Sequence, residues 1–72
     1  MSIKKGDSVK CINCHDGEFT AGSVYVVKAG EGDLDKVCGG IVYADGFIVT
    51  DDHGNDDYCV YPSCLYGDWG LV

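Results

Sequence analysis

The chain has 72 residues, which is enough for one small domain with a single core. It carries five Lys and no Arg against twelve acidic residues, and the net charge of −7 disfavours direct binding to nucleic acids or anionic membranes, which are themselves negatively charged. No apolar run is long enough to span a membrane and no signal peptide follows Met1, so we expect a cytoplasmic protein without a membrane partner.

The first part of the chain predicts two strands. Eleven Gly and many β-branched residues favour β-structure over helices. Residues 7–13 alternate between apolar and polar side chains, with Val9 and Cys11 on one face and Lys10 on the other, as in a half-buried strand. Residues 23–30 predict a second strand, and apolar side chains on both of its faces indicate a central position in the sheet.

The rest of the chain predicts a loop and then further strands. Residues 31–40 are charged and bounded by Gly, which indicates a long loop or insertion that holds at most a short irregular strand. A tight turn at residues 44–46 is expected to join two strands, and a second turn at residues 51–57 leads to a strand that ends at Pro62. A closing strand follows around Trp69.

These elements define the expected fold class. Five or six short strands without a covering helix have to bury their apolar faces by curling the sheet on itself. We therefore predict an all-β fold in which residues 1–72 form a single domain, a small barrel of five or six short antiparallel strands.

Three segments carry a family resemblance: KKGDSVKCI (4–12), TAGSVYVV (20–27) and FIVTDDHGNDDYCVYP (47–62). With a Lys-Gly-Asp opening, a Gly-x-x-Tyr-x-Val strand and a closing Tyr-Pro, the chain resembles the small Src-homology-3-like barrel proteins encoded among the accessory genes of tailed bacteriophages. The resemblance spans most of the chain outside residues 31–40. It implies a Src-homology-3-like barrel and a noncatalytic module that acts in the host bacterial cytoplasm, and it leaves Cys14, Cys38 and Cys64 without an assigned role.

The five cysteines raise the question of a cofactor. Their odd number and the missing export signal predict free thiols. The segment CINCH matches a haem-attachment motif, but the chain is too small to enclose a porphyrin, and a redox dithiol would need a helix N-terminus to lower its pKa. We therefore expect no cofactor. The alternative is a structural zinc site, and its ligands would be Cys11, Cys14, Cys59 and Cys64. The four-residue spacing of the second pair is longer than in a zinc knuckle, and Cys11 and Cys59 fall on strand positions expected to be buried.

An acidic segment and two histidines are the other candidates for a metal site and a catalytic site. The segment DDHGNDD, residues 51–57, is rich in acids but lacks the Gly and Glu positions of an EF-hand, so we interpret it as a solvated hairpin tip at which only weak, adventitious Ca²⁺ binding is expected. His15 and His53 fall in predicted turns without a Ser or Cys nucleophile beside them, which predicts a protein that is not an enzyme.

The remaining hypothesis is a binding surface of aromatic anchors and acids, because aromatic residues contribute much of the energy of protein interfaces. The predicted protein-binding residues are Tyr43, Tyr61, Tyr66, Trp69, Asp51, Asp52, Asp56 and Asp57. The alternative is that Tyr25, Tyr58 and Trp69 fill the ends of the barrel.

The net charge indicates a host protein with a basic surface as the partner. The interaction module would bind this protein, and it could inhibit it by acidic mimicry of nucleic acid. Zinc stabilisation and a homodimer formed through an exposed strand edge are the alternatives.

Overall fold

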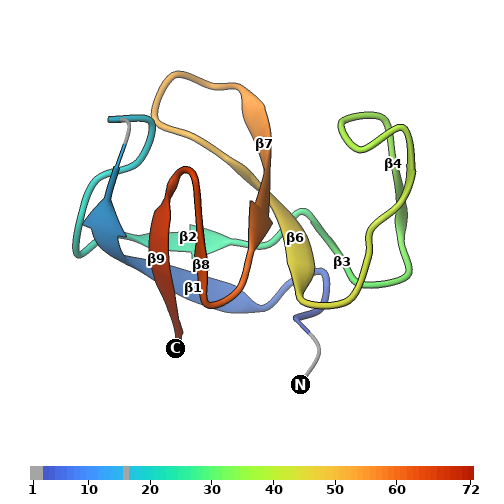
Figure 1. The fold of residues 1–72 in the computed structure, drawn as a ribbon, viewed down its shortest axis with the longest axis horizontal. Helices are drawn as coiled ribbons and strands as arrows, with labels where there is room; N and C mark the ends of the chain where they lie inside the picture. Colours follow the sequence, from blue (N-terminus) through green and yellow to red (C-terminus); the bar gives the residue numbers. More distant parts are fainter. Residues whose placement is uncertain (1–2, 16) are drawn as a thin grey trace.

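The protein consists of strands and turns. In a computed structural model, which describes residues 3–15 and 17–72, no helix occurs, so none spans a membrane within these residues. Nine short strands form three antiparallel sheets (Figure 1). The strands are β1 (Ser8–Cys14), β2 (Val24–Val26), β3 (Ala29–Gly30), β4 (Leu34–Asp35), β5 (Gly40–Ile41), β6 (Gly46–Thr50), β7 (Asp56–Val60), β8 (Ser63–Cys64) and β9 (Gly67–Leu71). The predicted all-β fold class is confirmed.

The first sheet has the strand order β2-β1-β9-β8. Its longest strand, β1, shows the alternation predicted from the sequence, because Val9 and Cys11 are buried and Lys10 is exposed. On the neighbouring strand β9, Trp69 lies directly opposite Cys11 and therefore points to the same, inner face.

The second sheet has the order β3-β6-β7. Its central strand β6 contains Phe47, Ile48 and Val49, whose side chains are all fully buried, as expected for a strand that is covered on both faces. The turn between β6 and β7 is closed by a hydrogen bond from the backbone N–H of Asp51 to the carbonyl of Asn55, at 2.8 Å. The predicted hairpin tip at residues 51–57 is thus confirmed.

The core has two parts, one on each face of β6. The larger cluster combines both sheets, with Trp69 in edge-on contact with Phe19 and Phe47 at ring centroid distances of 4.9 and 5.3 Å. The smaller cluster contains Ile48 and Val42. Alternation along β6 explains this division, because the side chain of Ile48 points to one face of the sheet and those of Phe47 and Val49 point to the other.

Two sequence predictions about strand pairing are wrong. The second strand, β2, lies at the edge of its sheet rather than in the centre, and its Val24 and Val26 are exposed. The turn before Gly46 exists, with Asp45 at a positive φ of 63°, but β5 does not pair with β6. The reason is that Val42 is buried in the smaller cluster, where its N–H donates to the carbonyl of Asp33, and this contact directs β5 towards β4.

Residues 31–40, predicted as a loop with at most a short strand, contain β4 and lead into β5. These two strands pair only with each other, with Leu34 opposite Ile41, and the hairpin extends from one side of the molecule (Figure 1). The three sheets are not joined by hydrogen-bonded strand pairs, so the described strands form no closed barrel.

Candidate functional site

The four predicted aromatic anchors do not form one exposed surface. Tyr43 is 76% exposed, whereas Tyr61 and Tyr66 are partly buried against the larger core cluster. Trp69 is only 3% exposed, so its prediction as a surface anchor is wrong, because the alternation of β9 points it inward between Phe19 and Phe47. Trp69 is part of the larger core cluster, so the alternative of an inward-pointing Trp69 holds, but the described strands form no closed barrel whose end it could fill.

The predicted acidic residues also divide into two groups. Asp52 accepts hydrogen bonds from the hydroxyls of Thr20 and Tyr25, at 2.5 and 2.8 Å, and these bonds hold the pKa of Asp52 below its ordinary value. Asp56 is paired in the same way with Lys28 at 2.5 Å. In contrast, Asp51 is only 6% exposed. The prediction of a solvated acidic rim is therefore wrong for Asp51, whose side chain turns into the hairpin.

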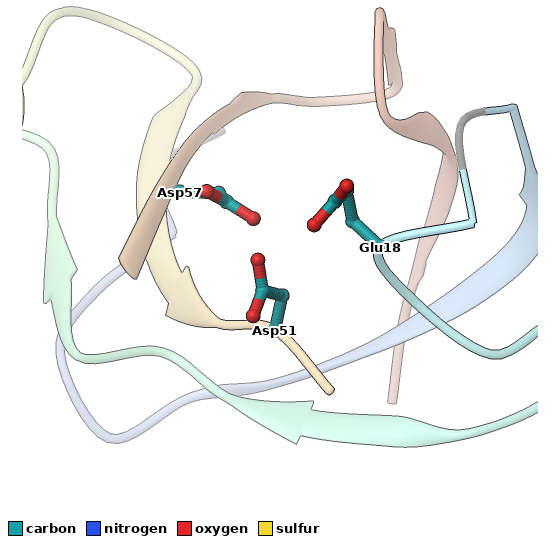
Figure 2. Close-up of side chains that lie close together, drawn as sticks. All are labelled: Glu18, Asp51 and Asp57. Carbon is teal, nitrogen blue, oxygen red and sulfur yellow. The ribbon is translucent and has the colours of Figure 1, made fainter. Parts of the chain in front are cut away.

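The carboxylate of Asp51 lies close to two other carboxylates, those of Asp57 and Glu18. Glu18, Asp51 and Asp57 each contribute a carboxylate oxygen to a group whose oxygens all lie within 4.8 Å of one another, and we call this group the carboxylate cluster. Figure 2 shows the three carboxyl groups pointing towards a common space. Asp51 begins the turn after β6 and Asp57 lies on β7, whereas Glu18 comes from the loop between β1 and β2. A backbone hydrogen bond from the N–H of Asp52 to the carbonyl of Glu18, at 3.0 Å, holds the two loops together.

The pKa values of Asp51 and Asp57 are shifted because negatively charged groups lie close together in a partly buried site. Burial, the hydrogen bond with Asp51 and the negative charges of Asp51 and Glu18 together raise the pKa of Asp57 to about 7. Burial also acts to raise the pKa of Asp51, but hydrogen bonding by Asp57 and by the backbone N–H groups of Asn55 and His53 outweighs it, and the pKa is lowered. A cluster of this kind needs a proton or a cation to offset its charge.

The four cysteines of the predicted zinc site lie at one end of the larger core cluster, arranged as two pairs. The Cys11 and Cys14 sulfurs are 2.9 Å apart, and the Cys59 thiol interacts with that of Cys64. Burial, together with Cys14, raises the pKa of Cys11 to about 12. All five cysteines, including Cys38, are free thiols. Among the described residues, only the carboxylate cluster brings three metal-binding side chains within 4.8 Å, so the thiols do not form a closed tetrahedron.

The β4–β5 hairpin carries exposed apolar side chains, of which Leu34 and Val37 lie in the predicted loop of residues 31–40. The side chains of Leu34 and Ile41, opposite each other in the ladder, are 78% and 55% exposed, and Val37 in the turn is 44% exposed. Tyr43 lies two residues after β5 and is the one predicted anchor that is highly exposed. A shallow hollow of about 350 Å³ lies at the base of the hairpin, between Leu34 and Lys28.

Sequence reasoning missed Glu18 and the hairpin surface. Glu18 has no local signal, because its partners in the carboxylate cluster are far away along the chain and only the contact between two loops brings them together. Leu34 gave a weak signal, since it is a large apolar residue between two aspartates, but Ile41 lies between Gly40 and Val42 and gave none. A two-residue strand is too short for its periodicity to be recognised.

No protein family, no curated protein and no solved structure matches this chain. The resemblance to bacteriophage accessory proteins therefore stays a prediction.

Proposed function

We propose that this protein is a noncatalytic interaction module, a phage-type accessory protein with a Src-homology-3-like arrangement of strands, which docks its β4–β5 hairpin on a host protein in the bacterial cytoplasm. The observation that carries this proposal is the exposed apolar surface of the hairpin, formed by Leu34, Val37, Ile41 and Tyr43. A contiguous group of large apolar side chains on the surface of a small protein is typical of a binding site.

The local structure of the hairpin supports this function. An isolated two-stranded hairpin is marginally stable in water, and apolar side chains that pack on nothing add little to its stability. Leu34 and Ile41 occupy adjacent positions across the two strands, so one partner pocket can receive both. Contacts with a partner would supply the burial that the domain itself does not provide.

The charge of the chain indicates what kind of partner fits. The net charge is −7, and Asp33 and Asp35 flank Leu34 on the hairpin. An apolar pocket surrounded by Lys or Arg residues is therefore the complementary surface, and the long-range attraction would accelerate association. In a narrower form of the proposal, this basic surface is the nucleic-acid-binding face of the host protein, which the module blocks by mimicry.

The test compares two exposed leucines. Leu34 on β4 and Leu65 in the turn between β8 and β9 are 78% and 84% exposed, so either can be replaced by Ser without opening the core. A partner is first captured from a bacterial lysate on the immobilised full chain, and the affinity of the purified pair is then measured by calorimetry. We expect Leu34→Ser to weaken binding at least about tenfold and Leu65→Ser to change it less than about twofold.

The same measurement in rising salt tests the charge argument, because attraction between exposed opposite charges weakens as the ionic strength increases. Equal affinities for both leucine variants would contradict docking through the hairpin. Size-exclusion chromatography with light scattering covers the homodimer alternative. Self-association that persists in Leu34→Ser would identify a strand edge such as β2 as the contact instead.

A second function, stabilisation by structural zinc, is favoured by one observation: the thiols of Cys11 and Cys14, and those of Cys59 and Cys64, lie in neighbouring pairs at one end of the core. Rotation of the four side chains would be needed to form a tetrahedral site with Zn–S distances of about 2.3 Å. Metal analysis of protein purified under reducing conditions, combined with thiol titration, tests this. One zinc per chain and thiols that react only after chelation support it, whereas five titratable thiols without metal in the unfolded protein contradict it.

A further inference from the structure

The carboxylate cluster contains buried oxygens without a hydrogen-bond donor. Within Asp51, Oδ1 accepts hydrogen bonds from the backbone N–H groups of His53 and Asn55, both at 2.9 Å, which fix the orientation of the carboxylate. Its second oxygen, Oδ2, and Oδ2 of Asp57 are both buried with no donor from the backbone or from a basic side chain, so either a proton shared between the two carboxyl groups or a cation has to satisfy them. Since Asp51 as a whole is only 6% exposed, water reaches this carboxylate poorly. A buried carboxylate oxygen without a donor is costly, so the cluster needs a proton or a cation, and a cation can satisfy several of these oxygens at once.

The chemistry of the donors selects the class of ion. All three side chains offer oxygen, and no Cys sulfur or His nitrogen belongs to the group. Oxygen-only sites are preferred by hard cations, among which Ca²⁺ accepts irregular geometry at metal–oxygen distances of about 2.3–2.6 Å. Two ligands of one Ca²⁺ ion are therefore separated by at most about 5 Å, which agrees with the 4.8 Å limit that contains all three oxygens. Mg²⁺ needs a smaller and nearly ideal octahedron.

The protein surroundings allow an ion to enter. Glu18 is 34% exposed in its side chain and faces solvent on the outer side of the cluster. His53 lies nearby, with its Nε2 4.0 Å from an oxygen of Glu18, and it is 61% exposed, so it can move away when a cation binds. The partly exposed side leaves room for water molecules, which complete the coordination of Ca²⁺ in many protein sites.

We propose that Glu18, Asp51 and Asp57 bind one Ca²⁺ ion, which joins the loop between β1 and β2 to the tip of the β6–β7 hairpin. The ion neutralises the three converging carboxylates and supplies the missing partner of Asp51 Oδ2. This binding site is independent of the hairpin surface in the proposed function, because it lies on other loops. With three carboxylates and several waters, the affinity corresponds to a dissociation constant of the order of 10⁻⁴ M.

Isothermal titration calorimetry of CaCl₂ into the chelator-treated full chain at pH 7.5 tests the proposal. We expect one ion per chain and an affinity for Mg²⁺ that is at least about tenfold lower. Binding should also raise the melting temperature by about 10–20 °C when free Ca²⁺ is 100 times the dissociation constant.

Two ligand variants and one matched control locate the site. Asp57→Asn and Glu18→Gln each remove one carboxylate charge and keep the shape of the side chain, and each should weaken Ca²⁺ binding at least about tenfold. Asp56→Asn removes the same charge from the same strand, but Asp56 is paired with Lys28 outside the cluster, so the affinity should change less than about twofold. Glu18 lies on a loop, so its variant keeps the test valid even where Asp57→Asn fails to fold.

Three outcomes would overturn the proposal. The first is the absence of binding heat and of a melting shift at 10 mM Ca²⁺. The second is an equal loss in Asp56→Asn, which would mean diffuse attraction to an acidic surface. The third is that Asp57→Asn stabilises the chelated protein while Ca²⁺ has no effect on the original chain, which would mean that a shared proton, and not a cation, occupies the cluster.

Discussion

The two hairpins β6–β7 and β4–β5 have opposite relations to the core. The strands β6 and β7 pair over five residues each, and Phe47, Ile48 and Val49 are fully buried. The strands β4 and β5 pair over two residues, and Leu34 and Ile41 are exposed. The difference teaches that apolar residues in this chain have two separate roles. On β6 they are required for folding, and on the β4–β5 hairpin the folded domain does not need them, which favours a role in binding.

The largest expected effect comes from removing the central side chain of the buried hairpin. Phe47→Ala deletes a ring that is fully buried and in edge-on contact with Trp69, at a centroid distance of 5.3 Å. Because it leaves a cavity, we expect the free energy of unfolding to fall by about 3–5 kcal/mol, which is most of the stability of a domain of this size. Urea unfolding followed by Trp69 fluorescence measures it.

The matched control is Leu34→Ala on the projecting hairpin, where the expected change is within about 0.5 kcal/mol. A large loss for Leu34→Ala, or a small one for Phe47→Ala, would remove the distinction between the two hairpins.

A second comparison uses two glycines. An added Cβ at Gly30, on β3 beside β6, would clash with the carbonyl oxygen of Ile3, whereas a Cβ at Gly40, on β5, would meet nothing within 4 Å. Gly30→Ala should therefore destabilise the domain by about 1–3 kcal/mol, because the backbone of residues 3–4 has to move. Gly40→Ala should be neutral or stabilise by up to about 1 kcal/mol. Thermal unfolding of both variants measures the difference, and similar melting temperatures would contradict it.

The sequence allowed the core hairpin to be predicted better than the projecting one. Alternation in β1 and the apolar run of β6 are long enough to show a period, and the acidic turn at residues 51–57 marks the hairpin tip. The pairing partners could not be predicted, because the edge position of β2 depends on which strand reaches the other side of β1. Strand β2 has the composition of a central strand, and its exposed Val24 and Val26 show that composition alone does not determine strand order.

Some site residues could likewise be predicted from the sequence, and others could not. The four cysteines named as zinc ligands do lie near one another, because Cys14 and Cys64 are both paired with Gly67 across the sheet. The prediction of Trp69 as a surface residue is wrong although β9 does alternate, with Trp69 and Leu71 on the face opposite to Asp68 and Gly70. The cluster of Glu18, Asp51 and Asp57 depends on a contact between two loops, which leaves no periodic signal in the sequence.

An intermediate effect is expected from pH at the tip of the β6–β7 hairpin. The pKa of Asp57 rises from an ordinary value of 3.8 to about 7 in the folded protein. The folded state thus holds a proton at Asp57 that the unfolded state releases, and without a metal ion the contribution of Asp57 to stability is complete below about pH 4 and is lost as the pH rises through about 7. We expect a loss of about 1 kcal/mol over this range.

Chelated protein unfolded in urea between pH 4.5 and 7.5 measures this dependence. Asp57→Asn should flatten the curve, while Asp68→Asn, outside the cluster, should not. A stability that increases steadily with pH in both the original chain and Asp57→Asn would show that Asp57 does not carry the proton.

The smallest expected effect is the interaction between Leu34 and Ile41, which distinguishes a free hairpin from one that folds back on the domain. The two side chains face each other across the ladder, so a double-mutant cycle with Leu34→Ser and Ile41→Ser should give a coupling of about 0.2–1 kcal/mol. Each single variant should lose less than about 0.5 kcal/mol, because more than half of each side chain is already exposed. Losses above about 1.5 kcal/mol in the single variants would mean that the hairpin packs on its own domain in solution. Its apolar surface would then be covered, and a host protein could reach it only after the hairpin had been released.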